Sequence, residues 1–165
     1  MRILGVDPGT RAMGYGVIED RDGEITLVDC GALTAQARSS IGERLSFMYN
    51  KLLEIVLRCQ PDAVAIEQPF VAKNVKSALA IGRAQAVAIL AAANNGIPTY
   101  EYTPARIKQS VANYGASPKE QIQEMVRLQL GLPQITQPSD AADALAVALC
   151  HLSEIHLSNL LAKHQ

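Results

Sequence analysis

Two short apolar runs in this chain each end in a single carboxylate. Residues 3–6 are followed by Asp7, and residues 63–66 are followed by Glu67. Runs of this length and composition are typical of strands that are buried on both faces of a sheet. Pro8 and Gly9 then break the first strand, so Asp7 lies where that strand ends. Because Asp-Pro-Gly is ordinary turn chemistry, this stretch alone favours an aspartate that caps its own turn.

Alternating positions after this turn predict an antiparallel meander. Residues 14–18 and 25–30 form the expected second and third strands, with a hairpin turn at residues 21–24. Gly14 and Gly16 lie on the same face of the second strand and leave that face bare of side chains.

Apolar residues then recur at helical spacing from Ile41 to Cys59. Ser40 and Glu43 predict a capping box at the start of this helix, and Pro61 lies just beyond its end. A strand–helix–strand connection normally crosses right-handed and sets its two strands parallel in one sheet. If residues 63–67 lie beside the first strand, two carboxylates end side by side, an arrangement that structure alone explains poorly.

The second half of the chain adds one strand and several helices. Asn74 is a candidate N-cap of a helix that runs to about Asn95, and residues 98–102 predict a fifth strand. Further helices are expected after Thr103, after Ser117 with a second capping box, and after Ser139. The order predicts an α/β fold with a mixed five-stranded sheet and helices on both faces. With 165 residues, the chain is most simply a single domain, residues 1–165.

Composition limits the possible partners and the compartment. The net charge of -1 gives no global nucleic-acid signal, so an anionic partner requires a local basic patch. Cys30, Cys59 and Cys150 show no CxxC spacing and indicate core thiols in a reducing compartment. No signal peptide is evident, and Arg83 and Gln85 interrupt the alanine-rich residues 77–93. We therefore expect a soluble, cytoplasmic protein that has no contact with a membrane.

Four carboxylates on three elements indicate a metal site. Asp140 and Asp143 share one face in the first turn of the last expected helix, where the helix dipole alone accounts for an isolated pair. If they converge with Asp7 and Glu67, mutual repulsion raises some of their pKa values unless cations neutralise them. Oxygen-only ligands suit magnesium or manganese. Two such ions can activate water for phosphodiester hydrolysis.

Three motifs carry a closer resemblance: GVDPGT (residues 5–10), IEQPFVAKN (residues 66–74) and SDAADALAVALCH (residues 139–151). In order and spacing, over nearly the whole chain, they resemble the RuvC family of Holliday-junction resolvases. The resemblance implies a ribonuclease-H-like fold and four acidic catalytic and metal ligands at Asp7, Glu67, Asp140 and Asp143. Some relatives carry histidine at the position of Asp140.

The same resemblance implies a magnesium-dependent crossover junction endodeoxyribonuclease of recombination and DNA repair. Each site of this homodimeric family takes two Mg2+ ions, with Mn2+ able to substitute, and the two sites make paired symmetric nicks in four-way junction DNA. A branch-migration complex of the RuvA and RuvB type is the implied partner. The Ala/Gly-rich helix around Leu79, Gly82 and Ala86 is a candidate dimer surface, with core burial of that helix an equal alternative.

Several other residues are candidates for DNA contact. An exposed Phe70 would stack on an opened base, as the matching aromatic of the family is proposed to do, although the core can also claim it. Lys73 and Lys76, with Arg83 farther along, would line one face near the catalytic loop. Lys108 and Lys119 match lysines of the family that act at the catalytic site and on DNA. A single lysine is most often only a solvated charge.

His151, His156 and His164 lie on or beyond the last expected helix. His151 and His156 are expected at a surface or interface and not as metal ligands.

Three rival functions remain to be compared with a junction resolvase. A ribonuclease-H-type enzyme would cut RNA–DNA hybrids without preferring branches. Residues 5–10 also resemble the first phosphate turn of actin-like kinases and ATPases, but 165 residues leave no room for their second lobe. The four acids argue against a non-catalytic junction-binding module.

Overall fold

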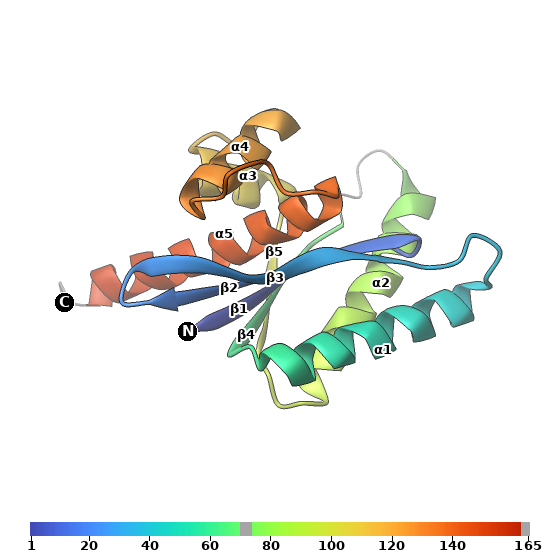
Figure 1. The fold of residues 1–165 in the computed structure, drawn as a ribbon. Helices are drawn as coiled ribbons and strands as arrows, with labels where there is room; N and C mark the ends of the chain where they lie inside the picture. Colours follow the sequence, from blue (N-terminus) through green and yellow to red (C-terminus); the bar gives the residue numbers. More distant parts are fainter. Residues whose placement is uncertain (70–73, 163–165) are drawn as a thin grey trace.

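A computed structural model describes residues 1–69 and 74–162 as a mixed sheet with helices on both faces (Figure 1). The strands are β1 (Arg2–Asp7), β2 (Ala12–Arg21), β3 (Glu24–Thr34), β4 (Ala63–Glu67) and β5 (Thr99–Tyr102). The helices are α1 (Ile41–Cys59), α2 (Val75–Ala93), α3 (Pro104–Ala112), α4 (Lys119–Gln129) and α5 (Ser139–Ala162). The α/β class and the five-stranded mixed sheet are therefore confirmed.

The order of the strands places β1 at the centre of the sheet. That order is β3-β2-β1-β4-β5, in which β1 pairs antiparallel with β2 and parallel with β4. Val6 is the partner of Ile66, so the next residue of each strand, Asp7 and Glu67, lies at the same end of the sheet. The neighbouring carboxylates expected from the two apolar runs are confirmed.

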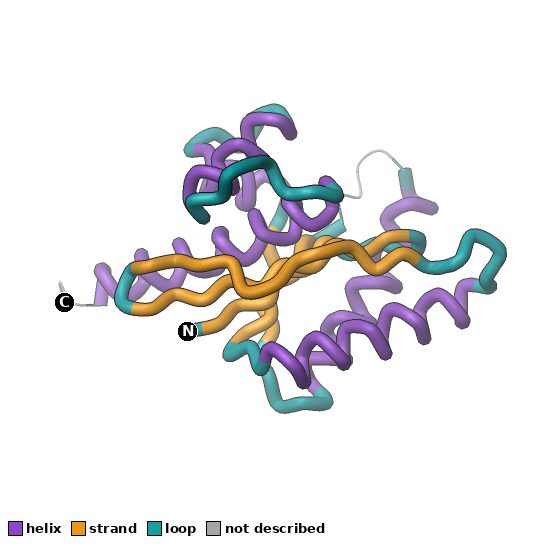
Figure 2. The backbone as a smooth tube through the Cα atoms, viewed as in Figure 1, coloured by secondary structure: helices purple, strands orange, loops and turns teal. Residues whose placement is uncertain are grey.

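The helices form two layers around the sheet (Figures 1 and 2). One face carries α1 and α2, which pack on each other, and its core includes Leu4, Val6, Met48 and Leu52. The other face carries α5, and α3 and α4 pack against the outer side of α5. Because α5 is covered on both sides, its first half is almost continuously buried, from Ala141 to Leu152.

Three glycines allow α5 to approach the sheet closely. A Cβ at Gly14 would lie 2.0 Å from the carbonyl oxygen of Asp140, and one at Gly5 would lie 2.0 Å from that of Ala144. A Cβ at Gly16 would meet the side chain of Leu145 at 2.6 Å. The face of β2 that the sequence leaves without side chains is therefore the surface on which α5 packs. This close packing sets the distance between Asp140 and β2.

Local capping partly follows the sequence. The box between Ser40 and Glu43 is present at the start of α1 and is confirmed. The second predicted box is wrong, because α4 has Pro118 at its N-cap without a side-chain cap. Ser117 instead donates its hydroxyl to the carbonyl oxygen of Tyr114 at 2.8 Å. The third strand is also longer than expected, because its antiparallel pairing with β2 continues to Thr34.

By length and composition alone, α2 and α5 are apolar enough to cross a membrane. The interruption of residues 77–93 by Arg83 and Gln85 does not take α2 below this composition. In the folded chain, α5 is the central helix between the sheet and the pair α3 and α4, and α2 packs on α1. The core helices of soluble proteins share this composition when they are buried.

Candidate active site

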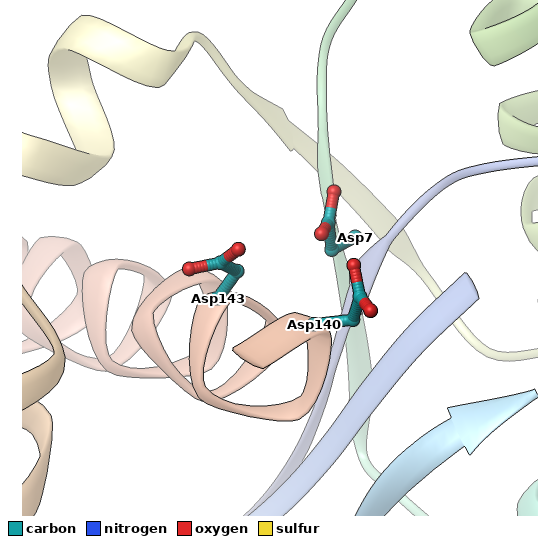
Figure 3. Close-up of side chains that lie close together, drawn as sticks. All are labelled: Asp7, Asp140 and Asp143. Carbon is teal, nitrogen blue, oxygen red and sulfur yellow. The ribbon is translucent and has the colours of Figure 1, made fainter. Parts of the chain in front are cut away.

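Three aspartates from two elements converge at one end of the sheet. Asp7 ends β1, and Asp140 and Asp143 project from the first turns of α5 (Figure 3). One carboxylate oxygen from each of the three lies within 4.8 Å of the others. Such spacing lets the three side chains share a cation. The structure thus brings the DxxD pair of the last helix to the aspartate that ends the first strand.

Glu67 completes the acidic cluster from β4. It lines the same cavity as Asp7 and Asp143, and its carboxylate accepts a hydrogen bond from the Asp7 carboxyl. A hydrogen bond between two carboxyl groups requires a proton on one of them. In the absence of a cation, the cluster therefore holds a proton where a metal-bound site would hold positive charge.

Burial and mutual repulsion explain why this proton stays. Burial raises the pKa of Asp7 to about 8, and the charges of Glu67, Asp143 and Asp140 add to the effect. Burial also raises the pKa of Glu67, followed by the charge of Asp143. Four carboxyl groups without sulfur or nitrogen ligands are the donor set that hard divalent cations prefer. The residues present therefore fit a divalent metal.

Two lysines face the acids from the helical layer above. The cavity has a volume of about 310 Å³ and is lined by Asp7, Glu67, Pro104, Ile107, Lys108, Lys119, Ile122, Asp143 and Ala146. Lys119, the first residue of α4, places its Nζ 2.5 Å from Oδ2 of Asp143. Burial opposes the charge on Lys119, but the hydrogen bond and charge of Asp143 outweigh it and raise the pKa of the lysine. The positive charge of Lys108 partly offsets the rise that burial and Asp143 cause in the pKa of Glu67.

The other candidates lie away from this cavity or outside the described residues. Lys76 is exposed in the first turn of α2 and Arg83 is exposed on the same helix, and neither lines the cavity. Phe70 and Lys73 lie outside the described residues.

Neither of the two histidines in the described part of the last helix joins the four acids of the site. The expectation of a surface position is wrong for His151, which is 2% exposed and whose Nδ1 lies 2.7 Å from the Tyr102 hydroxyl. It is correct for His156, which pairs with Asp20 at 3.0 Å.

Sequence reasoning missed the apolar wall of the cavity. Pro104, Ile107 and Ile122 line it beside the lysines. The available signal was the amphipathic pattern of α3 and α4, which buries Ile107 and Ile122 and turns Lys108 and Lys119 toward the acids. An apolar wall lowers the local dielectric and strengthens each charge interaction inside the cavity.

Comparisons with known proteins agree with this architecture. The family model described as crossover junction endodeoxyribonuclease RuvC matches residues 3–151. A protein of that name from Dehalococcoides mccartyi is 56% identical over 163 residues, covering 99% of this chain and 98% of the relative. One from Chloroflexus aggregans is 55% identical over 151 residues, covering 92% of each chain. The structure of Thermus thermophilus RuvC in complex with a Holliday junction substrate has a TM-score of 0.90 at 33% identity, covering 96% of each chain.

Proposed function

The chain belongs to the RuvC family of crossover junction endodeoxyribonucleases, and we propose that it resolves four-way (Holliday) DNA junctions by paired, symmetric phosphodiester hydrolysis in recombination and repair. One observation carries this proposal: carboxylates from β1, β4 and α5 meet beneath two lysines in one cavity. The whole of residues 1–165 acts as one nuclease domain in this proposal.

Asp7, Glu67, Asp140 and Asp143 are the proposed catalytic ligands of two Mg2+ ions, with Mn2+ able to replace them. When bound, the ions would activate a water molecule and stabilise the leaving oxygen of the scissile phosphate. The raised pKa values of Asp7 and Glu67 support this assignment, because they show how strongly the site favours added positive charge. The expected products carry 5′-phosphate and 3′-hydroxyl ends.

The lysines of the cavity hold the DNA backbone over these acids. Lys108 and Lys119 contact the phosphates next to the scissile bond, where fixed positive charge stabilises the charge that develops in the transition state. Lys76, at the start of α2, contacts the backbone farther from the cut. Phe70 and Lys73 complete the proposed DNA contacts, with Phe70 stacking on an opened base.

Paired symmetric nicks require two sites related by a two-fold axis, so we propose a homodimer. The apolar residues on the exposed side of α2 support this helix as the dimer surface. Val75, Leu79 and Leu90 are 66%, 59% and 52% exposed, and Leu79 and Ala86 line an apolar groove of about 440 Å³. The alternative of core burial fails for these residues, because α2 buries its opposite side. The protein is proposed to act in the cytoplasm beside a RuvA- and RuvB-type branch-migration complex.

Nicking of a synthetic mobile four-way junction with Mg2+ tests the function. Linear duplex and an RNA–DNA hybrid are run in parallel, with a chelator control and the variant Asp7→Asn. Asp20→Asn, which changes a carboxylate at the far end of β2, is the matched control. We expect paired nicks in the junction that are lost with Asp7→Asn or chelator and kept with Asp20→Asn.

Two outcomes contradict the proposal. Cleavage of the hybrid alone assigns the protein to the ribonuclease-H class. Junction binding without cleavage under any divalent ion shows that the four acids do not form a working site.

A further inference from the structure

The lysine and arginine side chains fall into two groups according to their ion pairs. Among residues 1–69 and 74–162, seven pair with a carboxylate: Arg2, Arg21, Lys51, Arg58, Arg106, Lys119 and Arg127. Within residues 1–69 and 74–162, six make no ion pair: Arg11, Arg38, Arg44, Lys76, Arg83 and Lys108. A cation without a protein partner retains its charge for a ligand.

Within the described part of the chain, five of the six cations without ion pairs lie near the catalytic end of the sheet, and Arg83 lies midway along α2. The six lie in the loop after β1, in the connection from β3 to α1, in the first turns of α1 and α2, farther along α2, and in α3. Figure 1 shows the β3–α1 connection and the beginnings of α2 and α5 at one end of the sheet. Among the paired cations, Arg2, Arg21 and Arg58 lie at the opposite end, at the start of β1, the end of β2 and the end of α1. The near-neutral net charge therefore conceals an uneven distribution, in which, among the described residues, most cations without ion pairs gather at one end of the sheet and three ion-paired cations lie at the other.

Arg11 and Arg38 are exposed members of this set that have no role so far, whereas Arg44 is half-buried and Arg83 lies on the same helix as Lys76. Ala12 is the partner of Thr34, and the amide of Ala35 donates to the carbonyl oxygen of Arg11 at 2.9 Å. The loop that begins at Asp7 is thus fixed to the chain that leads to Arg38. Glu43, in the first turn of α1 after Arg38, accepts a hydrogen bond from the Ser40 amide at 2.6 Å and pairs with neither arginine.

The sheet sets the distance between this pair and the lysines. Lys108 follows β5 and Arg38 follows β3, the two edge strands, and the acids end the strands between them. Four spacings of about 4.8 Å separate the edge strands by roughly 19 Å. This length corresponds to roughly six base-pair steps of about 3.4 Å. A duplex arm lying across this end of the sheet would therefore meet cations on both sides of the acids.

We propose that Arg11 and Arg38 bind the DNA backbone of a junction arm on the β3 side of the cut, opposite Lys108. This inference rests on the proposed function, because it takes a DNA arm as the ligand. The four residues from Asp7 to Arg11 span at most about 14 Å. Arg11 therefore contacts a phosphate within roughly four base-pair steps of the scissile bond.

The salt dependence of junction binding tests this surface. The variant Arg11→Gln/Arg38→Gln is compared with Arg21→Gln/Lys51→Gln, which removes two ion-paired cations away from the acids. Binding is measured with a chelator, so that the DNA stays intact. Loss of two phosphate contacts should reduce the magnitude of the slope of log K against log salt by about 2, whereas the control keeps the wild-type slope.

Neutral methylphosphonate linkages locate the contact. Placed within about four steps of the cut on the proposed arm, they should weaken binding by the wild type and leave the double variant nearly unaffected. The inference is overturned if the Arg11→Gln/Arg38→Gln variant has the same salt slope as the control variant. It is also overturned if the variant and the neutral linkages weaken binding additively. If the wild type nicks junctions while either result is found, this inference alone fails. If it nicks no junction under any divalent ion, the proposed function fails, and the binding slopes still decide whether the arginines touch DNA.

Discussion

Asp7 is the residue whose chemistry most depends on a cation. Its pKa in the folded, metal-free chain is about 8, against an ordinary value of 3.8. Between these values the folded state binds more protons than the unfolded state, so the free energy of unfolding falls as pH rises. We expect the metal-free protein to lose on the order of 1–3 kcal/mol of stability between pH 5 and pH 8.

The variant Asp7→Asn should remove most of this slope, because asparagine carries no charge at either pH. Calorimetric melting with a chelator at a series of pH values measures the effect. At pH 8, added Mg2+ should raise the melting temperature of the wild type more than that of the variant. Parallel loss of melting temperature in the two proteins would mean that another group sets the pH dependence.

Lys119 is the second decisive residue, because it joins α4 to an acid of the site. The change Lys119→Met removes a cation 2.5 Å from Asp143 and should lower the nicking rate at saturating Mg2+ by roughly 10²- to 10³-fold. Lys119→Arg keeps the charge and should recover part of the rate. Lys51→Met, which breaks an exposed pair within α1, is the control and should leave nicking unchanged. An unchanged rate in Lys119→Met would limit this lysine to a structural role.

At this scale the sequence predicts the acids better than their partners. Asp7 and Glu67 could be placed together because each ends a buried strand, and parallel pairing sets both ends at one edge. The contact between Lys119 and Asp143 depends on how α4 packs on α5, which no local pattern specifies. The predicted cap at Ser117 is wrong for a related reason, because the Ser117 hydroxyl donates a hydrogen bond to a carbonyl group of the preceding loop instead.

The interface between α5 and the sheet fixes the geometry of the acids at the scale of elements. At Gly14 a methyl group would lie 2.0 Å from the Asp140 carbonyl oxygen, so Gly14→Ala must displace the start of α5. We expect a loss of roughly 1–3 kcal/mol in stability and a drop in nicking that excess Mg2+ does not restore. Gly42→Ala in α1 meets no atom within 4 Å and should stabilise the protein slightly. Chemical denaturation and nicking assays measure both, and equal effects of the two substitutions would exclude close packing as the cause.

Element order and type were predictable, since each strand and helix carries its own periodicity and stop signals. The environment of α2 was not. Its alanines and glycine suit close packing against either the core or a second chain. Only the fold shows that Ala84 and Val87 are buried in the core that α1 and the sheet share, while Leu79 is exposed. Sequence composition therefore left burial and dimerisation as equal alternatives.

At the scale of the whole molecule, net charge misleads because charge position matters more than its sum. A balance of -1 gives no global nucleic-acid signal, yet among the described residues cations without ion pairs collect around the acidic site. Their separation from the paired cations depends on tertiary neighbours such as Glu19 for Arg2 and Asp29 for Arg58. The local patch that the sequence requires is thus found only when the ion pairs are known.

The proposed dimer is the property that turns one nuclease site into a resolvase. Leu79→Glu places a charge in the exposed groove of α2 and should dissociate the homodimer, because an unpaired charge is costly at a buried contact. Leu57→Glu is the matched control, since Leu57 is 61% exposed on α1. Analytical ultracentrifugation should show a monomer only for Leu79→Glu. On a plasmid-borne junction this variant should give single, uncoordinated nicks in place of paired ones, because each acidic cluster belongs to one chain. A dimeric Leu79→Glu that still makes paired nicks would exclude α2 as the dimer surface.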